Sequence, residues 1–303
     1  MVKRGAIAAV IVLLLAATSS YHQTPSAPLI GPTTVALAAE TDRRDNPARL
    51  PASGKITPVP RIILGAATTS KVVALTFDLD MNAQMAAAAR AGAVWINKDA
   101  LSYLETHNVH ATLFMTGMWA EVYPTLAREL ATNPNFEIGD HSYSHPAFHT
   151  PCYRLEGVSR AEQARQIQRA QQAIERATGV LPQYFRFPGG CYDREALDLV
   201  HAAGLTPVQW NVNSIDAFNN YPQQIVSTVL SEVKPGSIVV MHLHGGANAP
   251  ATGLALRQLI PELEKRGYQF LTVSELLAAG TPIQRSEERR VGKECRSRWS
   301  PYH

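Results

Sequence analysis

Residues 72–80 read VVALTFDLD, so an unbroken apolar and β-branched run ends in two aspartates. A continuous run of this kind, in place of strict alternation, is typical of a parallel strand that is buried on both faces. Six further runs follow, at residues 111–116, 136–138, 184–187, 206–210, 237–241 and 269–273. The sequence therefore predicts a largely parallel sheet of seven short strands.

Helical segments lie between these predicted strands. The clearest begins at Ser159, which has the spacing of a capping box with Glu162, and ends at Gly179. Further helices are expected at residues 195–203, 223–233 and 254–266. Because strand and helix alternate along the whole region, we expect an α/β protein with a (β/α) barrel, complete or partial, and not a sandwich.

Ionisable residues follow five of the seven predicted strands. In a (β/α) barrel, the groups that carry out chemistry gather at the carboxyl ends of the strands. The five strand ends are residues 78–80 (DLD), 140–145 (DHSYSH), 186–190 (RFPGG), 213–216 (NSID) and 242–244 (HLH). The sequence therefore predicts one active-site mouth that these five segments share.

A metal site is one interpretation of the ionisable residues at these strand ends. His141 and His145 are four residues apart, which on a helical turn places both imidazoles on one side, although such a pair is common by chance. Asp78 and Asp80 point to the same side of an extended chain, and either completes a set of two histidines and one carboxylate. The alternative is a solvated acidic turn or a helix cap, which fits poorly directly after a buried run.

Four motifs, taken in order, resemble those of the polysaccharide deacetylase family (carbohydrate esterase family four). They are TFDLD at 76–80, HSYSH at 141–145, RFPGG at 186–190 and GSIVVMH at 236–242. The resemblance implies a distorted (β/α)7 barrel, a single catalytic domain that removes N- or O-acetyl groups from sugars with one divalent metal. We expect zinc, and the ligand types also suit cobalt, nickel or iron.

The resemblance also implies roles for individual residues. Asp78 matches the catalytic base, and Arg186 matches the arginine that orients this base. His141 and His145 match the metal ligands. The backbone N–H of Gly189 falls where the family places a donor to the oxyanion, so we expect Gly189 to contact the substrate.

The first motif departs from the commonest form of the family, in which the two aspartates are adjacent. Here Leu79 stands between them. We expect Asp80 to be the metal ligand, which leaves Asp78 as the base. In the alternative, Asp78 binds the metal and the base is missing.

His242 matches the general acid of the family. Asn213 stands where the family has an aspartate, so Asp216 is our candidate for holding His242 in its acidic form. His244 lies two residues beyond His242 and is the second candidate for the acid.

Cys152 and Cys191 each lie directly after a segment that is expected at the mouth. We predict that they form a disulfide that ties two active-site loops together, and the alternative is two buried free thiols.

The amino terminus resembles a secretory signal of the bacterial type, because Lys3 and Arg4 precede an apolar run at residues 5–17. We expect residues 1–38 to be a signal peptide or an N-terminal anchor and residues 39–65 to be a flexible linker. The protein is then secreted or held at the cell envelope, outside the cytoplasm. The membrane is a partner only if this segment is not cleaved.

The barrel is expected at residues 66–284, and residues 285–303 resemble the translation of a sequencing adapter, so they are excluded from fold reasoning. This tail holds five Arg, one Lys and three Glu, and it alone accounts for the formal net charge of +3. The other residues are neutral overall, which argues against a nucleic-acid partner.

These features predict a secreted, metal-dependent polysaccharide deacetylase. Its expected partners are acetylated polysaccharides, with the N-acetyl groups of peptidoglycan first and those of chitin-like amino sugars second. One alternative is an esterase that removes O-acetyl groups from xylan-like polymers. Another is a carbohydrate-binding barrel without catalytic activity.

Overall fold

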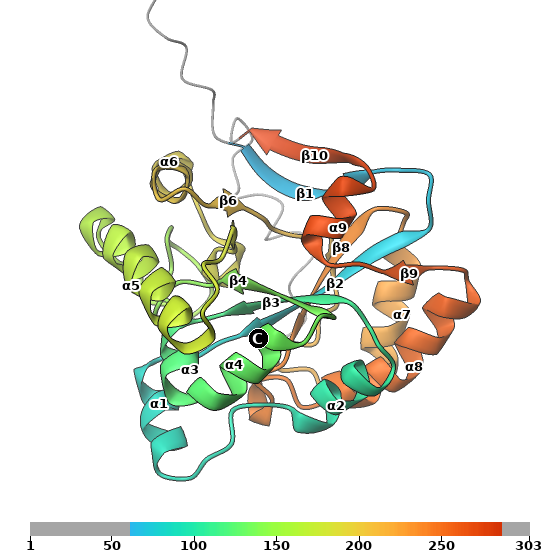
Figure 1. The fold of residues 1–303 in the computed structure, drawn as a ribbon, viewed down its shortest axis with the longest axis horizontal. Coiled ribbons are helices and arrows are strands. Elements are labelled where there is room, and N and C mark those ends of the chain that lie inside the picture. The colour runs from blue at the N-terminus through green and yellow to red at the C-terminus, as the bar shows by residue number, and fades with distance from the viewer. Residues whose placement is uncertain (1–60, 287–303) are drawn as a thin grey trace, which may run out of the picture. The chain divides into compact units, whose positions relative to one another are not determined.

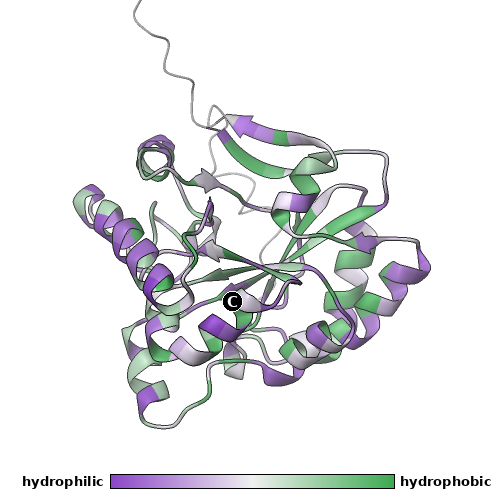
Figure 2. Ribbon diagram, in the orientation of Figure 1, coloured by the Kyte–Doolittle hydropathy of each residue, from purple (hydrophilic) through white to green (hydrophobic). Residues whose placement is uncertain are grey.

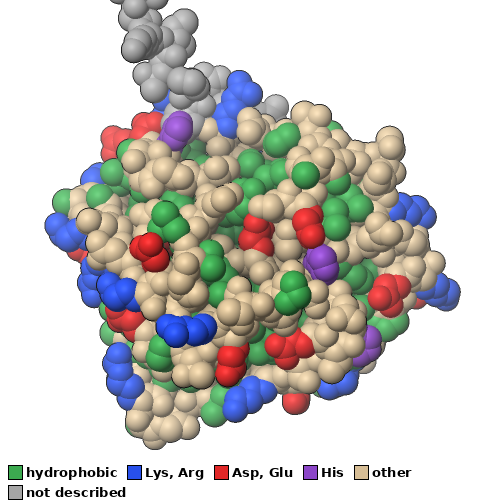
Figure 3. Space-filling view, in the orientation of Figure 1, with side chains coloured by type: hydrophobic (Ala, Val, Ile, Leu, Met, Phe, Trp, Pro, Cys, Tyr) green, Lys and Arg blue, Asp and Glu red, His purple; other side chains and the backbone are tan. Residues whose placement is uncertain are grey.

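A computed structural model describes residues 61–286 of the chain (Figure 1). The predicted signal or anchor at 1–38, most of the predicted linker and nearly all of the tail lie outside the described residues. Among the helices of residues 61–286, none is both long enough and apolar enough to cross a membrane. Basic and acidic side chains are interspersed over the face seen in Figure 3, in keeping with the neutral balance of residues 1–284.

The described strands form one mixed sheet in the order β10-β1-β8-β2-β3-β4-β5-β6, while β7 pairs with β8 and β9 pairs with β2. Their bounds are β1 Arg61–Ala67, β2 Val72–Leu79, β3 Ala111–Met115, β4 Phe136–Asp140, β5 Tyr184–Phe185, β6 Thr206–Pro207, β7 Val212–Asn213, β8 Ser237–His242, β9 Gln269–Phe270 and β10 Thr281–Ser286. All pairings from β2 to β6 are parallel, as the apolar runs predict, and β2 is buried along its whole length.

The sheet is curled, and its two margins approach each other. A parallel bridge joins Ile63 of β1 to Val208, and the N–H of Gln209 donates to the carbonyl of Ile63 at 2.8 Å. β1 lies between β10 and β8 in the sheet and pairs antiparallel with both. The result is a curled half-barrel with helices around it, which confirms the predicted distorted (β/α) barrel.

Helices cover the outside of this sheet, with α5 and α6 on one side and α7 and α8 on the other (Figure 1). Hydrophobic residues gather on the central strands, while hydrophobic and hydrophilic residues alternate along the helices (Figure 2). The helices are α1 Ala83–Arg90, α2 Lys98–Thr106, α3 Gly117–Val122, α4 Pro124–Thr132, α5 Arg160–Thr178, α6 Arg194–Ala202, α7 Pro222–Glu232, α8 Thr252–Lys265 and α9 Val273–Ala278.

Successive residues of the central strands face different apolar clusters, as the two-residue period of a strand requires. In β2, every second residue from Val73 to Leu79 belongs to the large cluster shared with α2, α3 and α8. Ala74 belongs instead to a second cluster with Phe114 and Val208. Because Asp78 lies on the same side as Ala74, the period directs its carboxylate into the interior of the half-barrel.

The predicted start and end of α5 are confirmed. The Ser159 hydroxyl accepts a hydrogen bond from the N–H of Glu162, and Gly179 ends the helix at a φ of 78°. Three other predicted helices, now α6, α7 and α8, begin one or two residues earlier than expected. The sequence reading missed five helices, of which α1 (AQMAAAAR) is rich in alanine and therefore shows little contrast between an apolar and a polar face.

Several boundaries required correction. The strands predicted at 184–187 and 206–210 are only two residues long, Tyr184–Phe185 and Thr206–Pro207. The predicted linker ran to residue 65, but β1 begins at Arg61 because Ile62 and Ile63 are buried and pair with β10. The predicted barrel ended at residue 284, whereas β10 pairs with β1 as far as Ser286. The last predicted strand is also shorter than expected, because Thr272 caps α9 through a capping box with Glu275.

Candidate metal and acid–base site

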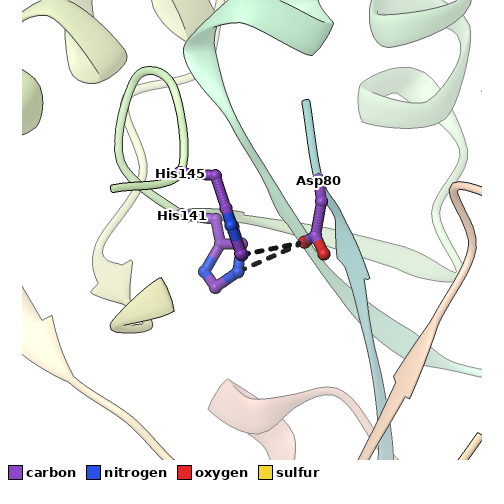
Figure 4. A group of neighbouring side chains, drawn as sticks. All are labelled: Asp80, His141 and His145. Carbon is purple, nitrogen blue, oxygen red and sulfur yellow. Dashed lines mark ion pairs between the residues drawn. The ribbon is translucent and has the colours of Figure 1, made fainter. Parts of the chain in front are cut away.

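Asp80, His141 and His145 form the centre of the site. One ligand atom from each lies within 4.8 Å of the other two. Asp80 Oδ1 is 3.3 Å from His141 Nε2 and 3.5 Å from His145 Nε2, so a single carboxylate oxygen faces both imidazoles (Figure 4). The expected group of two histidines and one aspartate therefore comes together, with Asp80 and not Asp78 facing both rings.

The two histidines converge through a loop, and not on the helical turn that their spacing first indicates. Ser142 and His145 have positive φ values of 67° and 62°. The N–H of Ser142 donates to Asp140 Oδ1 at 2.8 Å, which holds the first turn of this loop. From α5, Gln166 Oε1 accepts the N–H groups of Tyr143 and Ser144, which fixes the second half.

His141 is buried and its orientation is set by the backbone. Its Nδ1 lies 2.9 Å from the carbonyl oxygen of Arg186. A carbonyl only accepts, so Nδ1 carries a proton, and in the neutral ring the lone pair of Nε2 points toward Asp80. This is the tautomer in which a histidine binds a metal through Nε2.

The electrostatics of the group also suit a cation. Burial opposes the charge on Asp80, but the nearby His145 and His244 and the contact with His141 hold the pKa of this carboxyl well below its ordinary value. Burial lowers the pKa of His145 to about 4. Metal ligands need a carboxylate anion and neutral imidazoles, and the directions for Asp80 and His145 agree with this. Burial opposes the charge on His141, but Asp78 and Asp80 raise its pKa.

The fit to a metal is supported by buried polar atoms that lack partners. Within the described residues, Asp80 Oδ1 and His141 Nε2 are buried and have no hydrogen-bond partner. Leaving such atoms unpaired costs free energy, so buried polar groups in native proteins nearly always have a partner. A divalent cation bound by two imidazoles and a carboxylate oxygen would satisfy them.

Asp78 and Arg186 form a buried ion pair beside this group. Arg186 is fully buried, and its Nη1 donates to Asp78 Oδ1 at 2.8 Å while its Nη2 donates to the hydroxyl of Thr76 at 2.8 Å. The guanidinium also lies 4.0 Å from the ring centroid of Phe114. The second oxygen of Asp78, Oδ2, is 3.6 Å from His141 Nε2. One oxygen of Asp78 is thus held by Arg186, and the other faces the candidate metal site.

His242 is the last residue of β8, next to Asp78 of β2, and is paired with Asp216, as predicted. Its ring Nδ1 is 2.7 Å from Asp216 Oδ1, and its backbone N–H donates to Asp216 Oδ2 at 2.8 Å. The hydroxyl of Thr252 donates to the same Oδ2 at 2.7 Å. Burial disfavours the imidazolium, but Asp216 outweighs burial and raises the pKa of His242 to about 10.

Gly189 and the predicted disulfide lie together in the structure. Cys152 and Cys191 are bonded at an S–S distance of 2.14 Å, so the expected bridge is confirmed and the alternative of two free thiols is wrong. Gly189 has a φ of 61°, and a Cβ at this position would lie 2.8 Å from Cys152 Sγ. A residue with a Cβ would therefore strain the turn that carries the backbone N–H of Gly189.

Three residues that hold the site were missed by the sequence reading. Thr76 binds Arg186, Gln166 binds the histidine loop, and Thr252 binds Asp216. Thr76 lies two residues before Asp78 on the same side of the strand, so its position was a usable signal. No local pattern marks Gln166 or Thr252, since each lies more than twenty residues from the group it contacts.

Comparison with known proteins gives a consistent result. The sequence profile described as polysaccharide deacetylase matches residues 65–208. A chitooligosaccharide deacetylase of Sinorhizobium fredii is 32% identical over 182 residues, which cover 56% of this chain and 80% of that protein. A peptidoglycan-N-acetylglucosamine deacetylase of Bacillus cereus is 30% identical over 190 residues, which cover 63% of this chain and 64% of that protein. This chain thus spans less than two thirds of the length of the Bacillus cereus protein.

A solved structure shares the fold. The chain is similar to a CE4 family pseudoenzyme from Bacillus anthracis, with a TM-score of 0.59 and 27% identity. The match covers 73% of this chain and 70% of that one.

Proposed function

The chain belongs to the polysaccharide deacetylase family, and from this premise we propose that it is a metal-dependent enzyme that removes N-acetyl groups from amino-sugar polymers, peptidoglycan first. The observation that carries the proposal is that three carboxylates, each with a different kind of partner, meet at one mouth. Asp78 is paired with Arg186, Asp80 with two imidazoles, and Asp216 with His242. Each arrangement suits a different task in the hydrolysis of an amide.

Asp80, His141 and His145 would hold the divalent cation, with zinc as the first expectation and cobalt, nickel or iron as alternatives that the ligand types also allow. When bound, such a cation acts as a Lewis acid that polarises the acetyl carbonyl. Asp78 is the less suitable ligand, because Arg186 holds its Oδ1 and its Oδ2 is 3.6 Å from His141, whereas one oxygen of Asp80 faces both histidines.

Asp78 is proposed as the general base that takes a proton from the attacking water. A base must keep its lone pair directed at that water, and the charge-assisted bond from Arg186 Nη1 fixes the carboxylate in one orientation. The backbone N–H of Gly189 is the proposed donor to the oxyanion that forms on the acetyl oxygen, on a turn held rigid by the disulfide.

His242 is proposed as the general acid that protonates the departing sugar amine. The acid must carry a proton before the amine leaves, and Asp216 raises its pKa to about 10 against the effect of burial. His244 is the weaker candidate, because neither of its ring nitrogens has a hydrogen-bond partner among the described residues.

A binding role without turnover is the second candidate, because the similar structure from Bacillus anthracis is called a pseudoenzyme. A variant of that protein is described as having restored enzymatic activity. A complete set of proposed base, ligands and acid in this chain favours catalysis.

Acetate release tests the proposal. The purified protein is incubated with peptidoglycan, with N-acetylglucosamine oligomers and with acetylated xylan, each with chelator and after metal is added back. We expect release from the amino sugars, its loss with chelator and its return with metal. Release that is insensitive to chelator, release only from xylan, or no release from any substrate would each contradict the proposed activity.

A location outside the cytoplasm is proposed from two features. The amino terminus has the charged and apolar pattern of a secretory signal, and the chain has a disulfide of the kind that persists in oxidising compartments. Cell fractionation with an antibody against the barrel tests this, and recovery only in the cytoplasm would contradict it.

A further inference from the structure

Two neighbouring strands end in the same alternating pattern. β2 runs into Asp78-Leu79-Asp80, and β8 runs into His242-Leu243-His244. The strands are parallel and adjacent, with Asp78 in register with His242, and the N–H of Leu243 donates to the carbonyl of Asp78 at 3.0 Å. The leucine that separates the two aspartates is therefore matched by a leucine that separates the two histidines. Two residues further along, just beyond the ends of both strands, Asp80 Oδ2 and His244 Nδ1 are 3.6 Å apart.

His244 is buried, and its ring nitrogens make no hydrogen bond of normal length within the described residues. Only 2% of the residue is exposed, and neither Nδ1 nor Nε2 has a hydrogen-bond partner within the described part of the chain. The Nδ1 atom lies 3.6 Å from Asp80 Oδ2, its one ion-pair contact there. An imidazole that served only to fill the core would have its polar atoms paired, because burying them unpaired is costly.

The two oxygens of Asp80 face different histidines. Oδ1 faces His141 and His145 at 3.3 and 3.5 Å, whereas Oδ2 faces His244 at 3.6 Å. Asp78 and Asp216 are each held by short hydrogen bonds from donors that stay outside the metal group. Within residues 61–286, His244 is the group placed to do the same for Asp80 on the side away from the ligand histidines.

We propose that His244 is a positioning residue for Asp80: in the metal-loaded protein its Nδ1–H, which is 3.6 Å from Oδ2 here, would donate to Oδ2 and so turn Oδ1 toward His141 and His145, which sets the affinity for the divalent cation. The inference rests on the proposed function in one respect, namely that Asp80, His141 and His145 hold a metal. Ligating carboxylates are generally oriented by such partners, whose loss weakens metal binding about 10–100-fold.

The test compares metal affinity in three variants of the full chain, measured by competition with a chromophoric chelator for Zn²⁺. His244→Asn keeps a donor at the position of Nδ1, because the amide nitrogen of Asn is attached to the same carbon as Nδ1 of His. His244→Leu removes the donor, and His244→Gln moves it to the position of Nε2. We expect affinity close to that of the wild type for H244N and a loss of about 10–100-fold for H244L and H244Q.

His110→Leu is the matched control, since it also removes an imidazole that contacts a carboxylate. His110 Nδ1 is 2.9 Å from a carboxylate oxygen of Glu275, and His110 lies just before the start of β3, whereas the site residues follow the strand ends. It should leave the metal affinity unchanged. The visible absorption of bound Co²⁺ should be the same in the wild type and in H244N, because His244 is not a ligand.

Three results would overturn the inference. They are unchanged affinity in both H244L and H244Q, equal weakening in H244N and H244L, and a Co²⁺ spectrum that H244N changes as the loss of a nitrogen ligand would. If H244L does not fold, H244Q and H244N give the same comparison with a polar side chain at the site. These measurements need no substrate. If acetate release is intact but the affinity for Zn²⁺ does not depend on His244, only the present inference is wrong. The proposed activity fails alone if affinity depends on His244 but no acetate is released.

Discussion

The two sides of the mouth are built differently. On the acid side, the protein itself satisfies the carboxylate: Asp216 accepts from His242 twice and from the hydroxyls of Ser214 and Thr252. On the metal side, Asp80 Oδ1 and His141 Nε2 are buried without a hydrogen-bond partner among the described residues. The acid side is therefore pre-organised by the chain alone, while the metal side is complementary to a cation.

Removing the cation should have the largest effect, because it acts only on the unpaired side. Chelation, or His145→Ala, is expected to lower the rate of acetate release by about 10³-fold or more, since polarisation by a metal ion contributes several kcal/mol. The rate should return on adding metal to the chelated wild type. His149→Ala, at a partly exposed histidine that contacts Asp193, is the control and should keep full activity. A chelated protein that retains its rate would remove the basis of the comparison.

Asp78→Asn should have the next largest effect. The amide cannot accept the proton of the attacking water, so we expect the rate to fall by about 10²–10⁴-fold. Zinc affinity should change much less, because Asp78 faces the metal group with one oxygen only. Steady-state acetate release and chelator competition measure the two effects separately. Full activity in this variant would exclude Asp78 as the base.

Asp216→Asn sharpens the comparison from the acid side. Asp216 raises the pKa of His242 from its ordinary 6.5 to about 10, and the acid works only while it is protonated. Activity of the wild type should therefore persist well above pH 6.5 and fall as pH rises through the raised pKa. In the variant this alkaline limb should move to lower pH, with a loss of roughly 10²-fold at neutral pH. A pH–rate profile whose alkaline limb does not move would assign the acid to another group.

Removing the disulfide should have the smallest effect on rate and should act mainly on stability. The double variant Cys152→Ser, Cys191→Ser releases a loop closed across a sequence separation of 39 residues. We expect the free energy of unfolding to fall by about 3–4 kcal/mol, measured by urea denaturation with the reduced wild type for comparison. The side chains on both sides of the mouth remain, so a collapse of activity in the folded variant would show that the bridge does more than stabilise its loops.

Much of the fold could be predicted from the sequence, but some strands and helices were predicted better than others. β2, β3, β4 and β8 were predicted because a strand buried on both faces must be a continuous apolar run. β1, β7 and β10 were missed. β10 is an edge strand whose described side chains are exposed, so it shows no buried apolar run. The helix α5 was predicted nearly to the residue, because its cap residues Ser159 and Gly179 act locally.

The sequence predicted most of the residues that belong to the site but did not decide which of them contact one another. The sequence alone determined which segments carry chemistry, because the ionisable residues follow directly after the apolar runs, at the carboxyl ends of the strands. Only the tertiary structure decided between Asp78 and Asp80 as the residue that faces both imidazoles, and between His242 and His244 as the one paired with Asp216. Each choice depends on a distance of a few ångströms between atoms tens of residues apart. Such distances result from the packing of whole strands, and local spacing in the sequence carries no record of them.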